Sequence, residues 1–268
     1  MYSVVDMTRV NWGFDRENGS TYGCYGKTKV KERDGVYYYK LSNFNSEQGF
    51  IGEESIYEVI SSRFLRLLGF DCVKYSLVKV RVNIFGRTYI TFACKSRNFK
   101  TRGTWINFDT FREMFMQVPM EELIGRFHMG NSVRGIIAAD FMIIGRDRHG
   151  ANIQVCNVGN NYRIGPIFDN GISLLAPIPV NTPGSLELVQ TFDTGGNYPV
   201  NNYIGTRSLY ANLGYLEGYP VHANELHSED KRRIFYNLSE TLPKEYINKC
   251  WEILTFRYNY LRKGRYII

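Results

Sequence analysis

The sequence predicts a two-lobed α+β fold, in which residues 1–95 form a small strand-rich lobe and residues 96–268 form a larger, mainly helical lobe. Two observations favour this division. The first part contains several apolar, β-branched runs and one helical pattern, whereas helical periodicity dominates from about residue 107. A length of 268 residues, with 44% hydrophobic residues, is sufficient to build one such two-lobed core or two small domains.

The expected elements of the first part are three strands and one long helix. Aromatic and β-branched runs predict strands at 36–41, 75–80 and 87–92. A polar loop at 42–52 precedes Glu53–Ser55, where apolar residues begin to recur at helical spacing. This pattern continues to Leu68, and Gly69 follows it as a C-cap, so a helix is expected to end there.

The second part is expected to consist of helices and one long irregular segment. Helical periodicity predicts helices at 108–116, 121–127, 132–144, 228–238 and 244–262. Residues 176–224 are instead rich in Pro, Gly, Asn and Tyr, which is typical of a long loop. A loop of this length inside a compact domain is usually functional or mobile, so it is interpreted either as a structural insertion or as a substrate-docking surface.

The charge of the chain is compatible with anionic ligands but does not identify one. The net charge is +7 and the pI is about 9.1, which permits nucleotides, acidic protein surfaces or nucleic acid as partners. Basic residues are spread along the chain apart from a cluster at 27–33 and a tail at 257–265. No compact basic block resembles a DNA-binding arm, so direct nucleic-acid binding is not expected, and solvated surface charge is the plainer interpretation.

Cysteine spacing and hydropathy indicate a reduced, cytoplasmic protein. The five cysteines are isolated from one another in sequence and are odd in number, which favours free thiols over a disulfide framework or a zinc site. The first residues show no basic leader and no apolar signal segment, and no window approaches 18 consecutive apolar residues. A membrane span is therefore not expected.

Three oxygen-bearing side chains occur in a fixed order in the second part: Asp147, then Asn152, then Asp169. A carboxylate within hydrogen-bond reach of a hydroxyl accepts its proton and holds it in line, which is the role expected of Asp147. Asn152 and Asp169 offer oxygen ligands for Mg²⁺, which binds through few protein groups plus phosphate oxygens. The set indicates phosphoryl transfer. The competing interpretation is a charged turn at 147–149, and Asp140 is a candidate to tie this loop to the preceding helix.

Lys40 and a glycine-containing segment are the candidate phosphate contacts. Lys40 ends an apolar strand, where a charge is costly to bury unless it is paired. It can reach phosphates while pairing with Glu58 on the next helix, or it is an edge-strand lysine that points to water. Gly23, Gly26 and Lys27 lie in a segment whose backbone can approach phosphates closely. The segment matches neither standard glycine-rich pattern, so a plain hairpin is the alternative.

With these residues identified, the chain resembles the HipA-like Ser/Thr protein kinases, a family similar in architecture to phosphatidylinositol kinases. The resemblance extends over about residues 19–262. It rests on Tyr39-Lys40, the helix Glu58–Gly69, the motif Gly145–Asn152 and the segment Phe168–Leu175. One departure is that Gly145 stands where the family pattern has Asn, two residues before Asp147.

The resemblance implies a protein-kinase-like fold and an ATP- and Mg²⁺-dependent transfer of the γ-phosphate to Ser or Thr of a protein. It implies that Lys40 contacts the nucleotide phosphates, that Glu58 is the family's helix glutamate and that Asp147 is the catalytic base. Asn152 and Asp169 would then hold Mg²⁺. The interlobe hinge that contacts adenine is expected at Phe92, Ala93, Cys94 and Lys95.

The resemblance also implies a possible toxin role and an antitoxin-like partner, as in toxin-antitoxin systems. Two other functions stay open from the residues alone. One is a kinase whose acceptor is a lipid or a small molecule, since no sequence feature excludes such an acceptor. The other is a pseudokinase that binds nucleotide without turnover.

Overall fold

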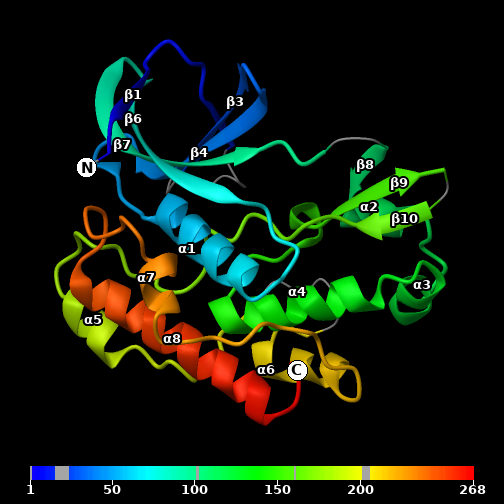
Figure 1. The fold of residues 1–268 in the computed structure, drawn as a ribbon. Coiled ribbons are helices and arrows are strands. Elements are labelled where there is room, and N and C mark those ends of the chain that lie inside the picture. The colour runs from blue at the N-terminus through cyan, green and yellow to red at the C-terminus, as the bar shows by residue number, and fades with distance from the viewer. Residues whose placement is uncertain (1, 16–23, 101–102, 160, 201–205) are drawn as a thin grey trace.

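The computed structural model describes residues 2–15, 24–100, 103–159, 161–200 and 206–268. Its strand-rich part lies above a part that contains most of the helices, with α1 (Glu54–Leu67) between them (Figure 1). Gly23, one of the predicted phosphate contacts, lies outside the described residues.

The upper part is a single sheet with the strand order β1-β6-β7-β4-β3-β2, in which β5 pairs with β4. The strands are β1 (Val4–Met7), β2 (Gly13–Asp15), β3 (Cys24–Glu32), β4 (Gly35–Asn45), β5 (Gly49–Phe50), β6 (Tyr75–Ile84) and β7 (Arg87–Arg97). Strand β1 joins β6 in parallel, and the other pairings are antiparallel. The three predicted strands are confirmed as β4, β6 and β7, each longer than its apolar run indicated.

Helix α1 connects the sheet to the rest of the molecule. Its buried side chains Tyr57, Ile60 and Phe64 recur at helical spacing and belong to the same hydrophobic core as the helices of the lower part. Gly69 has a φ of 89°, a left-handed conformation that favours glycine, and the helix ends just before it as predicted. A second, smaller core that includes Leu41 and Phe44 lies within the sheet. The functional side chains carried by α1 are therefore held against both parts of the fold.

The lower part is built around α4 (Gly130–Ile143) and α8 (Lys244–Lys263), which pack against each other (Figure 1). The shorter elements are α2 (Phe108–Glu113), α3 (Met120–Arg126), α5 (Ser185–Thr191), α6 (Leu209–Asn212) and α7 (Asp230–Ile234), with 3-10 turns at Gly150–Asn152 and Leu213–Leu216. The five predicted helices are present, although α7 is much shorter than the expected 228–238.

The expectation of a mainly helical second part is only partly correct. This part also contains a three-stranded antiparallel sheet in the order β10-β9-β8, formed by β8 (Thr104–Asn107), β9 (Gln154–Val158) and β10 (Asn161–Ile164). These strands have only four or five residues, too few to show a clear alternation in sequence.

The predicted irregular segment at 176–224 is largely packed into the core where the structure describes it. Its side chains Val189, Leu209, Leu213 and Leu216 are at most 2% exposed. This burial supports the interpretation of the segment as a structural insertion. None of the described helices is both long and apolar enough to cross a bilayer.

Candidate active site

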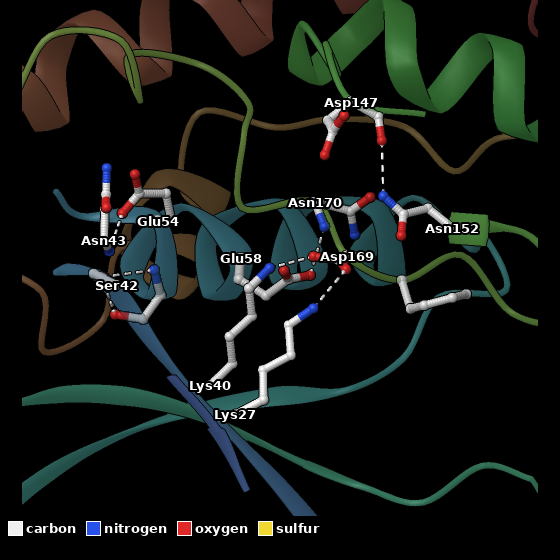
Figure 2. A network of polar contacts seen from close by, with 12 residues as sticks. Lys27, Lys40, Ser42, Asn43, Glu54, Glu58, Asp147, Asn152, Asp169 and Asn170 are labelled. Atoms are coloured by element: carbon white, nitrogen blue, oxygen red, sulfur yellow. Dashed lines mark hydrogen bonds and ion pairs between the residues drawn. The ribbon is translucent and has the colours of Figure 1, made fainter. Parts of the chain in front are cut away.

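An ion pair between the two parts of the fold is the centre of the candidate site. Lys40 lies on β4 between Lys27 of β3 and Cys94 of β7. Its Nζ atom donates to Oδ1 of Asp169, and Nζ of Lys27 lies 3.7 Å from Oδ2 of the same carboxylate (Figure 2). The alternative that Lys40 is an edge-strand side chain in water is wrong, because this side chain is only 16% exposed and β4 is an inner strand.

The two partners of this pair stay ionised because each stabilises the charge of the other. Burial acts to raise the pKa of Asp169, but the charges of Lys40 and Lys27 outweigh it and lower that pKa well below its ordinary value. Burial acts to lower the pKa of Lys40, and the carboxylates of Asp169 and Glu58 reverse this and raise it. The result is a charged pair at neutral pH beside a cavity.

Glu58 is brought to the site, but it binds the backbone next to Asp169. Its Oε1 atom accepts a hydrogen bond of 2.8 Å from the backbone N–H of Asn170, and its side chain is fully buried. Burial raises the pKa of Glu58. The sequence predicted that Lys40 pairs with Glu58, whereas in the structure Lys40 donates to Asp169. The backbone of Asp169 is left-handed, with a φ of 57°.

Asp147 and Asn152 lie on the other side of Asp169 from the two lysines (Figure 2). The side-chain Nδ2 of Asn152 donates to the backbone carbonyl of Asp147 at 2.8 Å, which leaves its Oδ1 as a ligand atom. The Asp147 side chain is 28% exposed, and Nε2 of His149 lies 3.8 Å from its Oδ2. The three predicted oxygen-bearing residues are therefore gathered in one region, with the carboxylate of Asp147 partly exposed.

Arg148 organises this region, and the sequence interpretation assigned it no role. Its guanidinium pairs with Asp140 of α4 at 3.0 Å and donates to the backbone carbonyl of Phe168 and to Oδ1 of Asn170. It also donates to the carbonyl of Asn152. Arg148 and Asp140 are 3% and 4% exposed, so the expected tie between Asp140 and the loop is confirmed. Its signal in the sequence was an arginine directly after Asp147 and eight residues after Asp140, an acidic residue on the predicted helix.

Gly145 is required by the same network. A Cβ atom at this position would lie 2.6 Å from Oδ1 of Asp140, so any side chain would displace the carboxylate that holds Arg148. This contact gives a packing reason for glycine at the position where the family pattern has Asn.

Lys40 and Asp169 line a cavity of about 230 Å³ between the sheet and the lower part. Phe168, Gln154, Tyr75 and Phe99 are also among its lining residues. Of the four residues expected at the hinge, only Cys94 lines this cavity. Phe92, Ala93, Cys94 and Lys95 all lie inside β7, and the chain leaves the sheet after them, at the cavity-lining residues Asn98, Phe99 and Lys100.

One described residue of the predicted phosphate segment reaches the cavity. Lys27 lines the cavity and faces Asp169. Gly26 lies in β3, where the register shifts, and a Cβ there would approach Leu41 Cδ1 to 2.9 Å and the Phe14 ring to 3.1 Å. Packing inside the sheet therefore explains the glycine at position 26 without any phosphate.

The donor set fits Mg²⁺ held jointly with a phosphate ligand. Asp169 is ionised, and Oδ1 of Asn152 supplies a second oxygen. In the part of the chain that the structure describes, no group of three or more His, Cys, Asp or Glu side chains is placed to hold a metal alone. Mg²⁺ in proteins usually binds one or two carboxylates and completes its coordination shell with phosphate and water oxygens, so this finding is compatible with a Mg²⁺ site.

Comparison with solved structures identifies known proteins of similar fold. No family model matches the sequence, and no curated protein matches it. Among solved structures, the proinflammatory kinase CtkA of Helicobacter pylori superposes with a TM-score of 0.64, covering 98% of each chain at 13% identity. The HipA toxin of Shewanella oneidensis, solved with HipB and operator DNA, matches with a TM-score of 0.46 at 12% identity, over 89% of this chain and 64% of HipA. The chain therefore has the mixed α+β fold of the kinase CtkA over nearly its whole length.

Proposed function

We propose that the chain is an ATP- and Mg²⁺-dependent kinase that transfers the γ-phosphate to Ser or Thr of a protein. One observation carries this proposal. Lys40 and Lys27 converge on Asp169 at a cavity, and Asp147 and Asn152 lie directly beyond Asp169 (Figure 2). Phosphoryl transfer requires this combination of cations for the phosphates, oxygen ligands for a metal and one accessible carboxylate for the hydroxyl.

The proposed roles follow from charge and exposure. Lys40 and Lys27 bind phosphate oxygens, since both are cationic and line the cavity. Asn152 and Asp169 are the residues that hold Mg²⁺, which when bound neutralises the charge of the phosphates. Asp147 accepts the proton of the attacking hydroxyl and holds it in line. Arg148 keeps the loop of Asp147 and the segment of Asp169 at a fixed separation.

The test is transfer of labelled γ-phosphate from ATP with Mg²⁺, for the wild type and for Asp147→Asn. We expect wild-type transfer to a protein and a loss of about 10³-fold in the variant, since a positioned base contributes roughly 10²–10⁴-fold. The fold of the variant is checked by its urea unfolding curve, and its nucleotide binding by thermal stabilisation with ATP. Full transfer by Asp147→Asn would show that Asp147 is not the base.

The acceptor is identified by offering a cell-protein extract and extracted lipids in parallel. Label on protein supports the proposal, whereas label on lipid alone would contradict the assignment of a protein acceptor. Stabilisation by Mg²⁺ and ATP without any transfer would indicate a pseudokinase. The toxin role and the antitoxin-like partner remain predictions from the sequence resemblance, and growth arrest that requires Asp147 would test the first of them.

A further inference from the structure

The C-terminal half of α1 borders a basic hollow that is distinct from the candidate active site. Arg63 and Arg66 of α1, Lys74 just before β6, and Arg233 of α7 line this hollow, which has a volume of about 400 Å³. No Asp or Glu is found among its described lining residues. Arg66, Lys74 and Arg233 are exposed. The hollow therefore concentrates positive charge on one side of the fold.

Two of these guanidinium groups are held in place by the backbone. Nη1 of Arg63 donates to the carbonyl oxygens of Ile234 at 2.9 Å and Tyr236 at 2.8 Å, and Nη1 of Arg66 donates to that of Cys72 at 2.9 Å. Each contact uses only one nitrogen of a group that has five N–H donors. The remaining donors are thus preorganised for an acidic group, which reduces the entropy lost on binding.

The hollow continues along α7 as a groove of mixed character. The adjoining hollow shares Arg63 and Arg233 and adds Arg232, Glu229 and Tyr236. The next one shares Arg232 and Tyr236 and is also lined by the apolar residues Phe235 and Ile247. Tyr236 is 62% exposed, so its ring offers an apolar surface beside these cations. We call this whole surface, from Lys74 to Ile247, the α7 groove.

We propose that the α7 groove binds an acidic peptide segment of a partner protein. The cations of the groove favour an anionic partner. The acidic residues among these cations favour a peptide over a uniformly charged polymer. Glu229 lies among the cations, and Asp230 pairs with Arg233 at 3.1 Å. A nucleic-acid strand carries a negative charge at every nucleotide and would be repelled at Glu229. A peptide can instead place carboxylates opposite Arg63, Arg66 and Lys74 and an apolar side chain on Tyr236.

The α7 groove and the cavity are neighbours that share one lining residue. Tyr75 lines both the basic hollow and the cavity that contains Lys40 and Asp169, so its side chain is part of the wall between them. The proposal itself concerns binding alone and does not depend on the proposed kinase activity.

The test is fluorescence anisotropy of a fluorescein-labelled peptide in which glutamates alternate with glycines and a leucine follows them, at about 0.15 M salt, an ionic strength that screens distant charges. The variants Lys74→Glu and Arg232→Glu reverse one charge at each section of the groove. We exclude Arg63 from the test because its carbonyl contacts support α7. The matched control is Arg112→Glu, which reverses an exposed arginine on α2, and urea unfolding shows that each variant is folded.

We expect saturable binding by the wild type, an affinity about tenfold lower in each groove variant, and a change of less than about twofold in Arg112→Glu. An equal loss in all three variants would overturn the proposal, because it would indicate attraction to the net charge of +7. The absence of saturable binding would also overturn it. Tighter binding of an oligothymidylate that weakens in the same groove variants would assign the groove to nucleic acid instead.

Discussion

The replacement Arg148→Met tests the buried network that holds the candidate site together. It removes the partner of Asp140 and leaves that carboxylate, which is 4% exposed, without its ion pair at 3.0 Å. Breaking a buried ion pair by removing one partner costs about 3–5 kcal/mol. The carbonyl oxygens of Asn152 and Phe168 and Oδ1 of Asn170 also lose a donor. Because such losses within one network are not additive, we expect a destabilisation of about 4 kcal/mol.

The assay is the free energy of unfolding from urea titration, for Arg148→Met, Asp140→Asn and the double variant. The double variant removes the uncompensated charge, so we expect it to recover about 2 kcal/mol relative to Arg148→Met. A loss below about 1 kcal/mol in Arg148→Met, or strict additivity in the double variant, would refute the argument.

Arg257→Met is a matched control that separates loss of fold stability from loss of Mg²⁺ and ATP binding. Arg257 is also fully buried, but its hydrogen bonds go to the carbonyl oxygens of Thr194, Phe141 and Gly196, and none of them joins the segments of Asp147 and Asp169. We expect it to destabilise the fold while the folded protein keeps its stabilisation by Mg²⁺ and ATP. Folded Arg148→Met, measured at low temperature, should lose that stabilisation, because the segments of Asp147 and Asp169 are no longer joined.

Three further predictions concern other residues of the fold. Burial raises the pKa of Glu53 to about 7, so wild-type stability should fall as pH rises from about 4.5 to 7, and this fall should be smaller in urea titrations of Glu53→Gln, where the buried Glu58 still contributes to it. Gly26→Ala should cost about 1–3 kcal/mol in the same titrations, because its methyl group approaches Leu41, and yet leave ATP binding unchanged in calorimetry. The pKa of Asp169 is lowered by Lys40, so their pair stabilises the fold above about pH 4 and is lost on acidification; Lys40→Met should therefore flatten the acid limb of the stability curve.

The strongest local patterns of the sequence were sufficient to predict the central elements. The helix from Glu54 to Leu67 was predictable because its apolar residues repeat at helical spacing and Gly69 follows them. Strands β4, β6 and β7 were predictable because aromatic and β-branched residues dominate them. The short strands β8, β9 and β10 were not, because four or five residues carry too little periodic signal and form through pairing with distant segments.

The candidate site was predictable as a set of residues but not as a set of contacts. Asp147, Asn152 and Asp169 could be named from their order alone. The partner of Lys40 could not, since Asp169 is 129 residues away and its left-handed backbone has no signature in the sequence. The four residues predicted as a hinge lie inside β7, because a strand that continues to Arg97 cannot be distinguished by composition from one that ends at Phe92.

The charges around Asp169 explain why one site can serve both an anion and a metal ion. Lys27 and Lys40 supply two positive charges, whereas burial raises the pKa of Glu58 to about 7, so that Glu58 is only partly ionised at neutral pH. With Asp169 ionised, the inner end of the cavity is positive, which favours phosphate groups over a neutral ligand. Mg²⁺ and Lys40 would share the carboxylate of Asp169, so a phosphate that binds Lys40 also makes Asp169 available to the metal. This reciprocity is a physical reason to expect nucleotide and Mg²⁺ to bind together.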